Sequence, residues 1–289
     1  MPIKESELIL NSDGSIYHLN LKPEHIANDV IFVGDQDRVN KITKYFDAIT
    51  FETQKREFKT QTGTYKGKQI SVISTGIGPD NIDIVMNELD ALVNIDLETR
   101  LPRDEHCSLN IVRVGTSGSL QPDIPVDHFV LSTHGLDLNG MLHFYEVDHI
   151  TNPEIEDAFI AHTHWNSKKA KPMVFNNSSV LESQFESDLT KKGITATAGG
   201  FYGPQGRVLR LALEDNTLNS KIDSFNFEGH RITNLEMETS VIYGMSKLLG
   251  HNALSLNAII ANRANGTFSE DPGDTVERLI QYTLNKMIN

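Results

Sequence analysis

Residues 29–46 read DVIFVGDQDRVNKITKYF, and this stretch sets the expected fold. Its first half is an apolar run that ends abruptly at Gly34-Asp35, which predicts a buried strand over 29–35. Its second half, residues 38–46, carries apolar side chains at helical spacing and predicts a helix. A strand followed at once by a helix is typical of α/β proteins, in which helices connect the strands of a largely parallel sheet.

The rest of the chain repeats this alternation. Strands are predicted over 51–75 (around a turn at Lys66-Gly67), from 111 into a glycine-rich loop that ends at 118, over 127–133 and over 253–263. Helices are predicted over 80–93 with Asp80 as its cap, 179–193 with lysines in its last turn and Gly193 after it, 236–250, and 274–288 with a capping box of Asp274 and Glu277.

This order of elements predicts an α/β fold whose sheet, parallel or mixed, is covered by helices on both faces. Residues 94–110 are polar and contain proline, which indicates an excursion from the core rather than a linker. Because the chain has neither an internal repeat nor a low-complexity tract, we expect one domain over residues 1–289.

Composition narrows the classes of function. The chain has 289 residues, 38% of them hydrophobic, and a formal net charge of -13, which argues against nucleic-acid or membrane-surface partners. Its one cysteine, Cys107, excludes an intrachain disulfide and fits a reducing compartment. No stretch approaches the length of a membrane span or of a signal peptide's apolar region, so we expect a cytoplasmic protein.

Polar and glycine residues gather just after the apolar runs. Ligands of open α/β sheets bind beyond the carboxyl ends of the strands, so these residues are candidates for one site. Glycines beside Thr and Ser hydroxyls suit phosphate, and guanidinium groups match its oxygens, yet no segment fits the Walker or dinucleotide fingerprint. The candidates are Gly34, Asp35, Arg38, Arg113, residues 115–118, the loop 201–207, Glu236 to Glu238, Asn262 and Arg263.

Several segments together resemble a known family. In order they are VGDQDRVNKI, KREF, STGIG, RVGTSGSLQP, GGFYGPQGR, NLEMETSVIYGM and IIANR, and they are similar to the signature segments of nucleoside phosphorylases of the uridine phosphorylase type. The resemblance runs from about residue 16 to the final helix. It implies a three-layer α/β/α fold with a mixed, partly barrel-like sheet, and phosphorolysis of uridine (or of deoxyuridine or thymidine) to the free base and a pentose 1-phosphate, with no cofactor and with inorganic phosphate as co-substrate.

The resemblance also assigns the phosphate and ribose sites. It implies that Gly34, Arg38, Arg113 and Thr116 bind phosphate and that Arg56 reaches the phosphate of a neighbouring subunit. Glu238 and Met237 match the ribose site, and His18 matches a histidine that reaches a neighbour's ribose. On a regular helix Glu236 and Glu238 would point about 200° apart. We therefore expect Glu238 on the sugar and Glu236 in a supporting or base-side hydrogen bond.

The loop 201–207 supplies the expected base site. A pyrimidine presents a carbonyl, an N–H and a second carbonyl along one edge, which a side-chain amide and a guanidinium can pair with. Gln205 and Arg207 offer those groups, Phe201 offers a face for packing, and Arg263 is expected to order the loop or a water. Because the base leaves as an anion, Arg207, Gln205 and Arg263 are also the catalytic candidates.

The same segments leave alternatives open. Purine-acting relatives carry an acid just after the strand 253–263, whereas this chain has Asn262 and Arg263 there, which favours a pyrimidine. A purine nucleoside phosphorylase, a nucleoside hydrolase of the same fold and a non-catalytic nucleoside-binding protein remain the other hypotheses. The resemblance further implies a homo-oligomer of dimer units, up to a hexamer, with active sites between subunits. It places a potassium ion at Glu57, Ile77 and Asn81, although Asn81 stands where a serine is expected.

Overall fold

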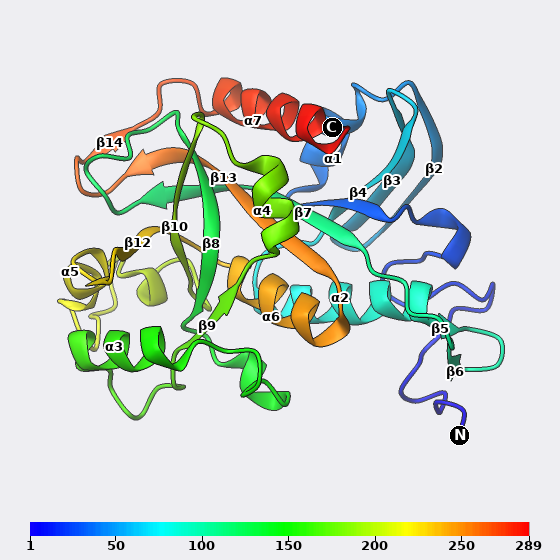
Figure 1. Ribbon diagram of the computed structural model, residues 1–289, viewed down its shortest axis with the longest axis horizontal. Coiled ribbons are helices and arrows are strands. Elements are labelled where there is room, and N and C mark those ends of the chain that lie inside the picture. The colour runs from blue at the N-terminus through cyan, green and yellow to red at the C-terminus, as the bar shows by residue number, and fades with distance from the viewer. Residues whose placement is uncertain (289) are drawn as a thin grey trace.

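One large mixed sheet organises the molecule. The computed structural model describes residues 1–288, so residue 289 of the predicted domain lies outside the described residues. Twelve strands form the sheet, whose main path is β11-β12-β10-β8-β13-β7-β1-β4-β3-β2 (Figure 1). The strands of the chain are β1 Asp29–Val33, β2 Ala48–Lys55, β3 Phe58–Tyr65, β4 Lys68–Ser74, β5 Ile95–Asp96, β6 Leu101–Pro102, β7 Asn110–Ser119, β8 Phe129–Asp137, β9 Met173–Asn176, β10 Thr190–Thr197, β11 Asn226–Phe227, β12 His230–Glu236, β13 Asn252–Asn262 and β14 Thr267–Phe268, of which β5 and β6 pair separately.

Part of the sheet closes into a ring. β7, β13, β8, β10 and β12 pair in that order, and β12 then pairs back with β7 through Asn234 opposite Ser119 and Leu235 opposite Gly118. β1 pairs in parallel with both β4 and β7, whereas β2, β3 and β4 are antiparallel. The predicted mixed and partly barrel-like sheet is therefore confirmed.

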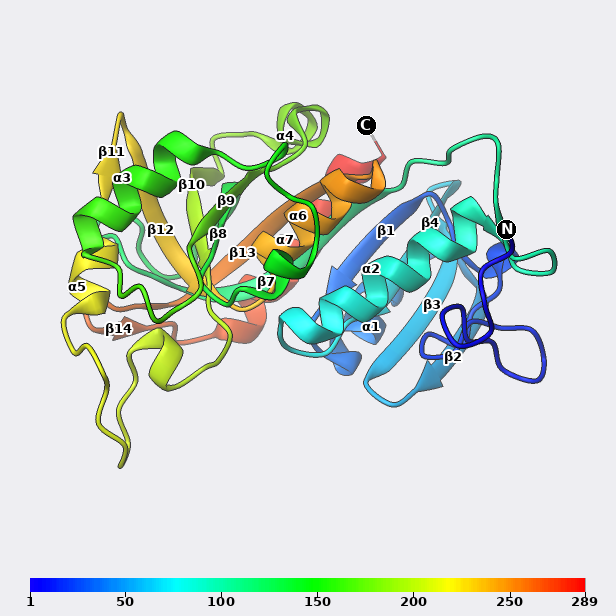
Figure 2. The same cartoon turned by 90° about the horizontal axis from the view of Figure 1, so that it is seen from below.

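Helices cover the sheet on both faces, as expected. α2 and α6 pack together on one face over a core that includes Leu89 and Val241, and α1, α4 and α7 bury Ile42, Phe185 and Leu279 on the other (Figures 1 and 2). α3 and α5 lie against the outer strands. The helices are α1 Gln36–Thr43, α2 Pro79–Asn94, α3 Pro153–Thr163, α4 Ser179–Phe185, α5 Leu218–Asp223, α6 Thr239–Leu249 and α7 Pro272–Met287, with 3-10 turns at Pro23–His25, Met141–Phe144 and Gly203–Gln205. Over residues 1–288, none of the helices combines the length and the apolar character that crossing a membrane requires.

The predicted helix over 179–193 is wrong in its second half. α4 ends at Phe185, and residues 190–197 form β10, which pairs in parallel with β8. Lys192 nevertheless pairs with acids at the end of this helix: its Nζ lies 2.8 Å from Glu182 in α4 and 3.0 Å from Glu186, the residue that follows α4. Lys192 thus lies near the end of α4 but is a residue of the next strand, β10, which runs beside the helix.

Three smaller predictions also need correction. The glycines of 115–118 are not a loop, because β7 continues to Ser119 and pairs with β13. Gly78, not Asp80, is the N-cap of α2, and Asp271 caps α7 by accepting from the Asp274 N–H, so the expected capping box is absent from this described helix. Glu236 ends β12 and Glu238 precedes α6, so neither lies in the helix predicted over 236–250.

Candidate active site

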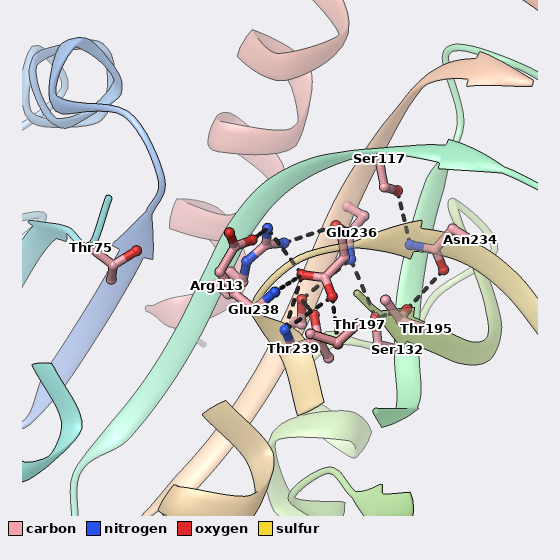
Figure 3. Close-up of polar contacts among 12 residues, drawn as sticks. Thr75, Arg113, Ser117, Ser132, Thr195, Thr197, Asn234, Glu236, Glu238 and Thr239 are labelled. Carbon is pink, nitrogen blue, oxygen red and sulfur yellow. Dashed lines mark hydrogen bonds and ion pairs between the residues drawn. The ribbon is translucent and has the colours of Figure 1, made fainter. Parts of the chain in front are cut away.

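A buried arginine lies at the centre of the candidate site. Arg113 folds along β7 over Gly115, where any Cβ would overlap its guanidinium. Its Nη2 lies 2.5 Å from an oxygen of Glu238 and 3.2 Å from one of Glu236 (Figure 3). Burial alone would lower the pKa of Arg113, but these two carboxylates raise it, so the guanidinium stays charged.

Glu236 is the last residue of β12 and Glu238 lies in the short bend before α6, so the two glutamates are not on one regular helix and both reach the same arginine. Glu236 also accepts hydrogen bonds from the Thr197 hydroxyl, at 2.7 Å, and from the backbone N–H groups of Glu238 and Thr239. Glu238 accepts from the N–H of Gly78, at 2.9 Å. The helical argument that separated the two acids does not apply, and Glu236 is occupied by the junction of β12 with α6 rather than by the base loop.

Burial raises the pKa of Glu238. The charge of Arg113 opposes this shift, whereas the neighbouring carboxylate of Glu236 adds to it. The contacts that favour the ionised form of Glu238 are those with the Arg113 guanidinium and the Gly78 backbone N–H.

A second arginine lies beside the first. Arg38 projects from α1, and its Nη1 donates to the carbonyl of Val114 on β7 at 3.3 Å. Burial lowers the pKa of Arg38, and the charge of Arg113 lowers it further, which reflects two cations held close together. Gly34 lies at the end of β1 next to β7, and Thr116 lies two residues beyond Val114. The predicted phosphate residues thus gather where β1 ends beside the middle of β7: Gly34 follows β1, Arg38 reaches over from α1, and Arg113 and Thr116 lie within β7.

The loop after β10 brings the predicted base residues together. The carboxamide oxygen of Gln205 accepts from Arg207 at 2.7 Å and from Arg263 at 3.4 Å. Arg263 also donates to the backbone carbonyl of Gln205 at 2.7 Å, and the Arg207 guanidinium stacks on Phe201 at 3.8 Å. Because its oxygen is taken by two guanidinium groups, the Gln205 amide presents its NH₂ as the free hydrogen-bonding group.

Positive charge is concentrated at this loop. Burial lowers the pKa of Arg263 to about 10, with a further contribution from the charge of Arg207, and burial also lowers the pKa of Arg207. Two guanidinium groups that repel each other beside one amide favour a ligand that is or becomes anionic.

One cavity borders the predicted sugar residue Met237, and another borders the loop 201–207. The first, of about 550 Å³, is lined by Gly78, Gly199 and Met237, and the second, of about 1010 Å³, is lined by Tyr202 and Arg207. Asn139 lines both cavities, so the cavity at Met237 and the cavity at the base loop are neighbours.

His18 and Arg56 lie apart from these groups. His18 Nδ1 is 2.6 Å from Glu88, and the Arg56 guanidinium lies 6.0 Å from the Tyr17 ring. Within residues 1–288 neither side chain forms a hydrogen bond or ion pair with Arg113 or with the loop 201–207. Their predicted roles toward a neighbouring subunit stay predictions.

The predicted cation residues do come together. A Cβ on Gly76 would meet the side chains of both Glu57 and Asn81, and Asn81 Nδ2 donates to the carbonyl of Ile77 at 3.3 Å. The amide therefore directs its nitrogen, rather than its oxygen, toward this carbonyl, and it would have to rotate to act as a ligand.

A second cluster of potential metal ligands lies on the far side of α2 and α6. Asp90, His106 and His251 approach one another within 4.8 Å. However, Nδ1 of His251 accepts the Leu109 N–H at 3.2 Å, so Nε2 carries the proton and faces Asp90 at 3.4 Å. His106 Nε2 donates to the Leu249 carbonyl. These contacts fasten residues 94–110 to the end of α6, and they leave no lone pair on His251 for a metal.

The fold and the site define an α/β protein whose strand ends carry a buried arginine–carboxylate centre beside a loop of converging amide and guanidinium groups. The chain belongs to the phosphorylase superfamily, because the model of that family matches residues 28–285. The family predicted from the sequence segments is thereby confirmed.

Known relatives extend this family assignment. The chain is 28% identical over 258 residues to a uridine phosphorylase of Thermococcus kodakarensis, covering 89% of this chain and 81% of the relative. It is 24% identical over 273 residues to a DeoD-type purine nucleoside phosphorylase of Listeria monocytogenes, covering 94% and 95%. A solved nucleoside phosphorylase of Trypanosoma brucei, described as showing uridine phosphorylase activity, superposes with a TM-score of 0.88 at 27% identity, covering 98% of this chain and 99% of that one.

Several residues that hold the site were not found from the sequence. The Gly78 N–H, the Thr197 hydroxyl and the Asn257 amide all contact the arginine or its glutamates. Thr197 is the last residue of β10, whose first half was predicted as helix, and Asn257 lies within the predicted strand 253–263, so only the pairing of these strands could reveal them. Asn219 of α5, which donates to the Gln205 carbonyl at 3.0 Å, likewise lay in a segment without a recognisable pattern.

Proposed function

We propose that this protein is a pentosyltransferase that cleaves uridine with inorganic phosphate, giving uracil and ribose 1-phosphate. The observation that carries the proposal is the contact between Arg113 and Glu238 at 2.5 Å. A carboxylate can accept hydrogen bonds from both hydroxyls of a ribose, and a guanidinium can pair with two phosphate oxygens. Because these groups touch, a phosphate on one is adjacent to a sugar on the other.

The phosphate side would act mainly by position and charge. Arg38 and Arg113 would hold the dianion against the ends of β1 and β7, with Gly34 and Thr116 beside it. A phosphate oxygen then forms a bond to C1′ of the ribose while the C1′–N1 bond breaks, and the bonding electron pair leaves with the base. Holding both reactants in one geometry removes much of the entropic barrier to this step.

The loop 201–207 would stabilise the departing base. As uracil leaves, negative charge develops on its ring, and the NH₂ of Gln205 and the guanidinium of Arg207 would donate hydrogen bonds to it. Arg263 would keep Gln205 in place through its contact with the backbone carbonyl. Arg207 stacks on Phe201, and it would turn from that ring to reach a base.

The choice of a pyrimidine over a purine rests on Asn262. Its NH₂ donates to the carbonyls of Gln121 and Ile124, and the side chain is buried. No carboxylic acid of the described chain therefore takes the place after β13 from which a purine N7 could be protonated. This favours the uridine phosphorylase activity named for the Thermococcus kodakarensis relative over the purine nucleoside phosphorylase activity named for the Listeria monocytogenes one.

Assembly and location complete the proposal. We propose a homo-oligomer of dimer units, in which His18 and Arg56 of one copy reach the ribose and the phosphate of the next. Their separation from Arg113 within one chain supports this arrangement. Glu57, the Ile77 carbonyl and Asn81 would hold a potassium ion once the amide rotates. A cytoplasmic location fits the single unpaired cysteine.

Uracil release from uridine by the purified protein, with and without phosphate, tests the function. We expect release only with phosphate, formation of an equal amount of ribose 1-phosphate, and no reaction with inosine. Release without phosphate would indicate a hydrolase, and phosphate-dependent release of hypoxanthine from inosine would indicate a purine enzyme. Saturable uridine binding without any turnover would indicate a binding protein.

A further inference from the structure

The interior of the five-strand ring contains a series of hydrogen-bonded polar side chains. Each strand contributes a buried side chain: Ser117 from β7, Asn257 from β13, Ser132 from β8, Thr195 from β10 and Asn234 from β12. Hydrogen bonds join them in series from Asn257 through Ser132, Thr195 and Asn234 to Ser117. The part of the series from Ser132 to Ser117 can be followed in Figure 3. Arg113 meets this series at Asn257, where its Nη1 donates to Oδ1 at 2.9 Å.

The register of two strands makes this contact possible. Asn257 on β13 lies directly opposite Gly115 on β7. Since Arg113 folds over Gly115, the guanidinium comes to rest against the residue that faces this glycine. A side chain at position 115 would separate the Arg113 guanidinium from the Asn257 amide, so Gly115 and Asn257 together form the binding position of the guanidinium.

The orientation of the Asn257 amide is fixed from its other side. Nδ2 donates to the hydroxyls of Ser132 and Ser255, each at 3.3 Å. Ser255 in turn accepts from the Thr239 hydroxyl, next to Glu238. With its NH₂ group engaged, the amide can only direct its oxygen at Arg113.

We propose that Asn257 is a positioning residue that presents Arg113 to phosphate, an inference that rests on the proposed function. Arg113 uses Nη2 for Glu238 and Glu236 and Nη1 for Asn257, so three acceptors fix the plane of its guanidinium. Two of these acceptors carry negative charge. A neutral amide as the third fixes the plane without adding a third negative charge beside a site for a dianion.

Substitutions at position 257 should therefore weaken phosphate binding much more than nucleoside binding. Asn257→Ala removes the acceptor, and we expect the KM for phosphate to rise about 10- to 100-fold, the usual range for a hydrogen bond to a charged group. Asn257→Asp keeps an acceptor of the same shape but adds a buried charge, and we expect a loss at least as large. In both variants the KM for uridine should change by less than about threefold.

Asn234→Ala is the matched control, because Asn234 is equally buried in the same series but contacts Ser117, Thr195 and Thr233 rather than Arg113. Steady-state KM values for phosphate and uridine are measured for wild type and the three variants, with phosphate-dependent shifts in melting temperature as a readout independent of turnover. A rise in the KM for phosphate only in the two variants at 257 supports the inference. An unchanged value in those variants, or an equal rise in Asn234→Ala, overturns it.

The outcomes separate this inference from the proposed function. If wild type releases no uracil with phosphate, the proposed function itself fails. If wild type is active and the variants at 257 behave like the control, only the role of Asn257 fails. Should Asn257→Ala not fold, Asn257→Asp carries the test alone, and normal phosphate binding in that variant overturns the inference.

Discussion

Removing the central guanidinium should destabilise the protein in a way that depends on pH. Arg113→Met keeps most of the side-chain volume but leaves the buried carboxylates of Glu236 and Glu238 without their shared cation. Glu236 retains the Thr197 hydroxyl and two backbone N–H donors, whereas Glu238 retains only the Gly78 N–H. The cost therefore falls mainly on Glu238.

The expected loss in the free energy of unfolding of Arg113→Met follows from the hydrogen-bond donors that remain for each carboxylate. Removing one partner of a buried ion pair costs about 3–5 kcal/mol, because a charge is left uncompensated. We expect a loss of that order in the free energy of unfolding near pH 8. Glu238→Gln added to Arg113→Met removes the uncompensated charge, so the double variant should recover at least about half of the loss.

The sign of the pH dependence comes from the pKa of Glu238. Burial already raises this pKa, and Arg113 is the main influence that opposes the rise, so the variant raises it further. A carboxyl group whose folded-state pKa exceeds its unfolded value, about 4.3, binds protons preferentially in the folded state. Its penalty is absent in acid and grows as pH rises from the unfolded to the folded pKa. The deficit of Arg113→Met should thus be smaller at pH 5 than at pH 8.

Urea unfolding at pH 5 and pH 8 measures this prediction. Arg231→Met is the control, because Arg231 forms an ion pair with Asp123 that is partly exposed, and such pairs contribute about 0–1 kcal/mol. A deficit below about 1 kcal/mol for Arg113→Met, or an equal deficit at both pH values, would refute the reasoning. So would a double variant with no recovered stability.

Three further predictions concern the loop 201–207, Gly115 and His134. Arg207→Ala should lower kcat for uracil release about 10²- to 10³-fold, while Arg210→Ala, an exposed arginine nearby, should leave it unchanged; equal rates would contradict the leaving-group role. Gly115→Ala should displace the Arg113 guanidinium and raise the KM for phosphate at least about tenfold, and an unaltered KM would argue against the overlap. Burial lowers the pKa of His134 to about 4, so the neutral imidazole of the folded protein costs free energy of folding that grows as pH falls from about 6.5 toward that value. In thermal melts over this pH range, His134→Asn should therefore lose less stability than wild type. Equal losses in the two proteins would contradict this prediction.

The sequence was informative wherever a short segment carries its own explanation. The apolar run before Gly34 and the spacing after it predicted β1 and α1 because burial patterns are local. The loop 201–207 was likewise predictable, since an amide and two guanidinium groups near glycines have few other uses. The prediction that Gln205, Arg207 and Arg263 act together agrees with their placement, although their roles in turnover stay predictions.

Local patterns failed where distant segments decide the conformation. The lysines after α4 resembled a helix end, yet parallel pairing with β8 draws residues 190–197 into a strand. Glu236 and Glu238 were expected to diverge on a helix, whereas pairing of β12 with β10 and β7 keeps the first of them in extended backbone. Both carboxylates then meet Arg113, a contact between residues 125 positions apart in the case of Glu238, which has no local signature.

By itself, the sequence therefore determined the α/β class, the family and the residues from which phosphate, ribose and base sites are expected, because these depend on short motifs. Only the tertiary structure decided that the sheet closes into a ring and that Asn257 comes to face Gly115. Strand register is set by turns and by the packing of the whole sheet, and one step of slippage would turn each side chain to the other face. The position of the Arg113 guanidinium is consequently determined by the closed ring and not by any single segment.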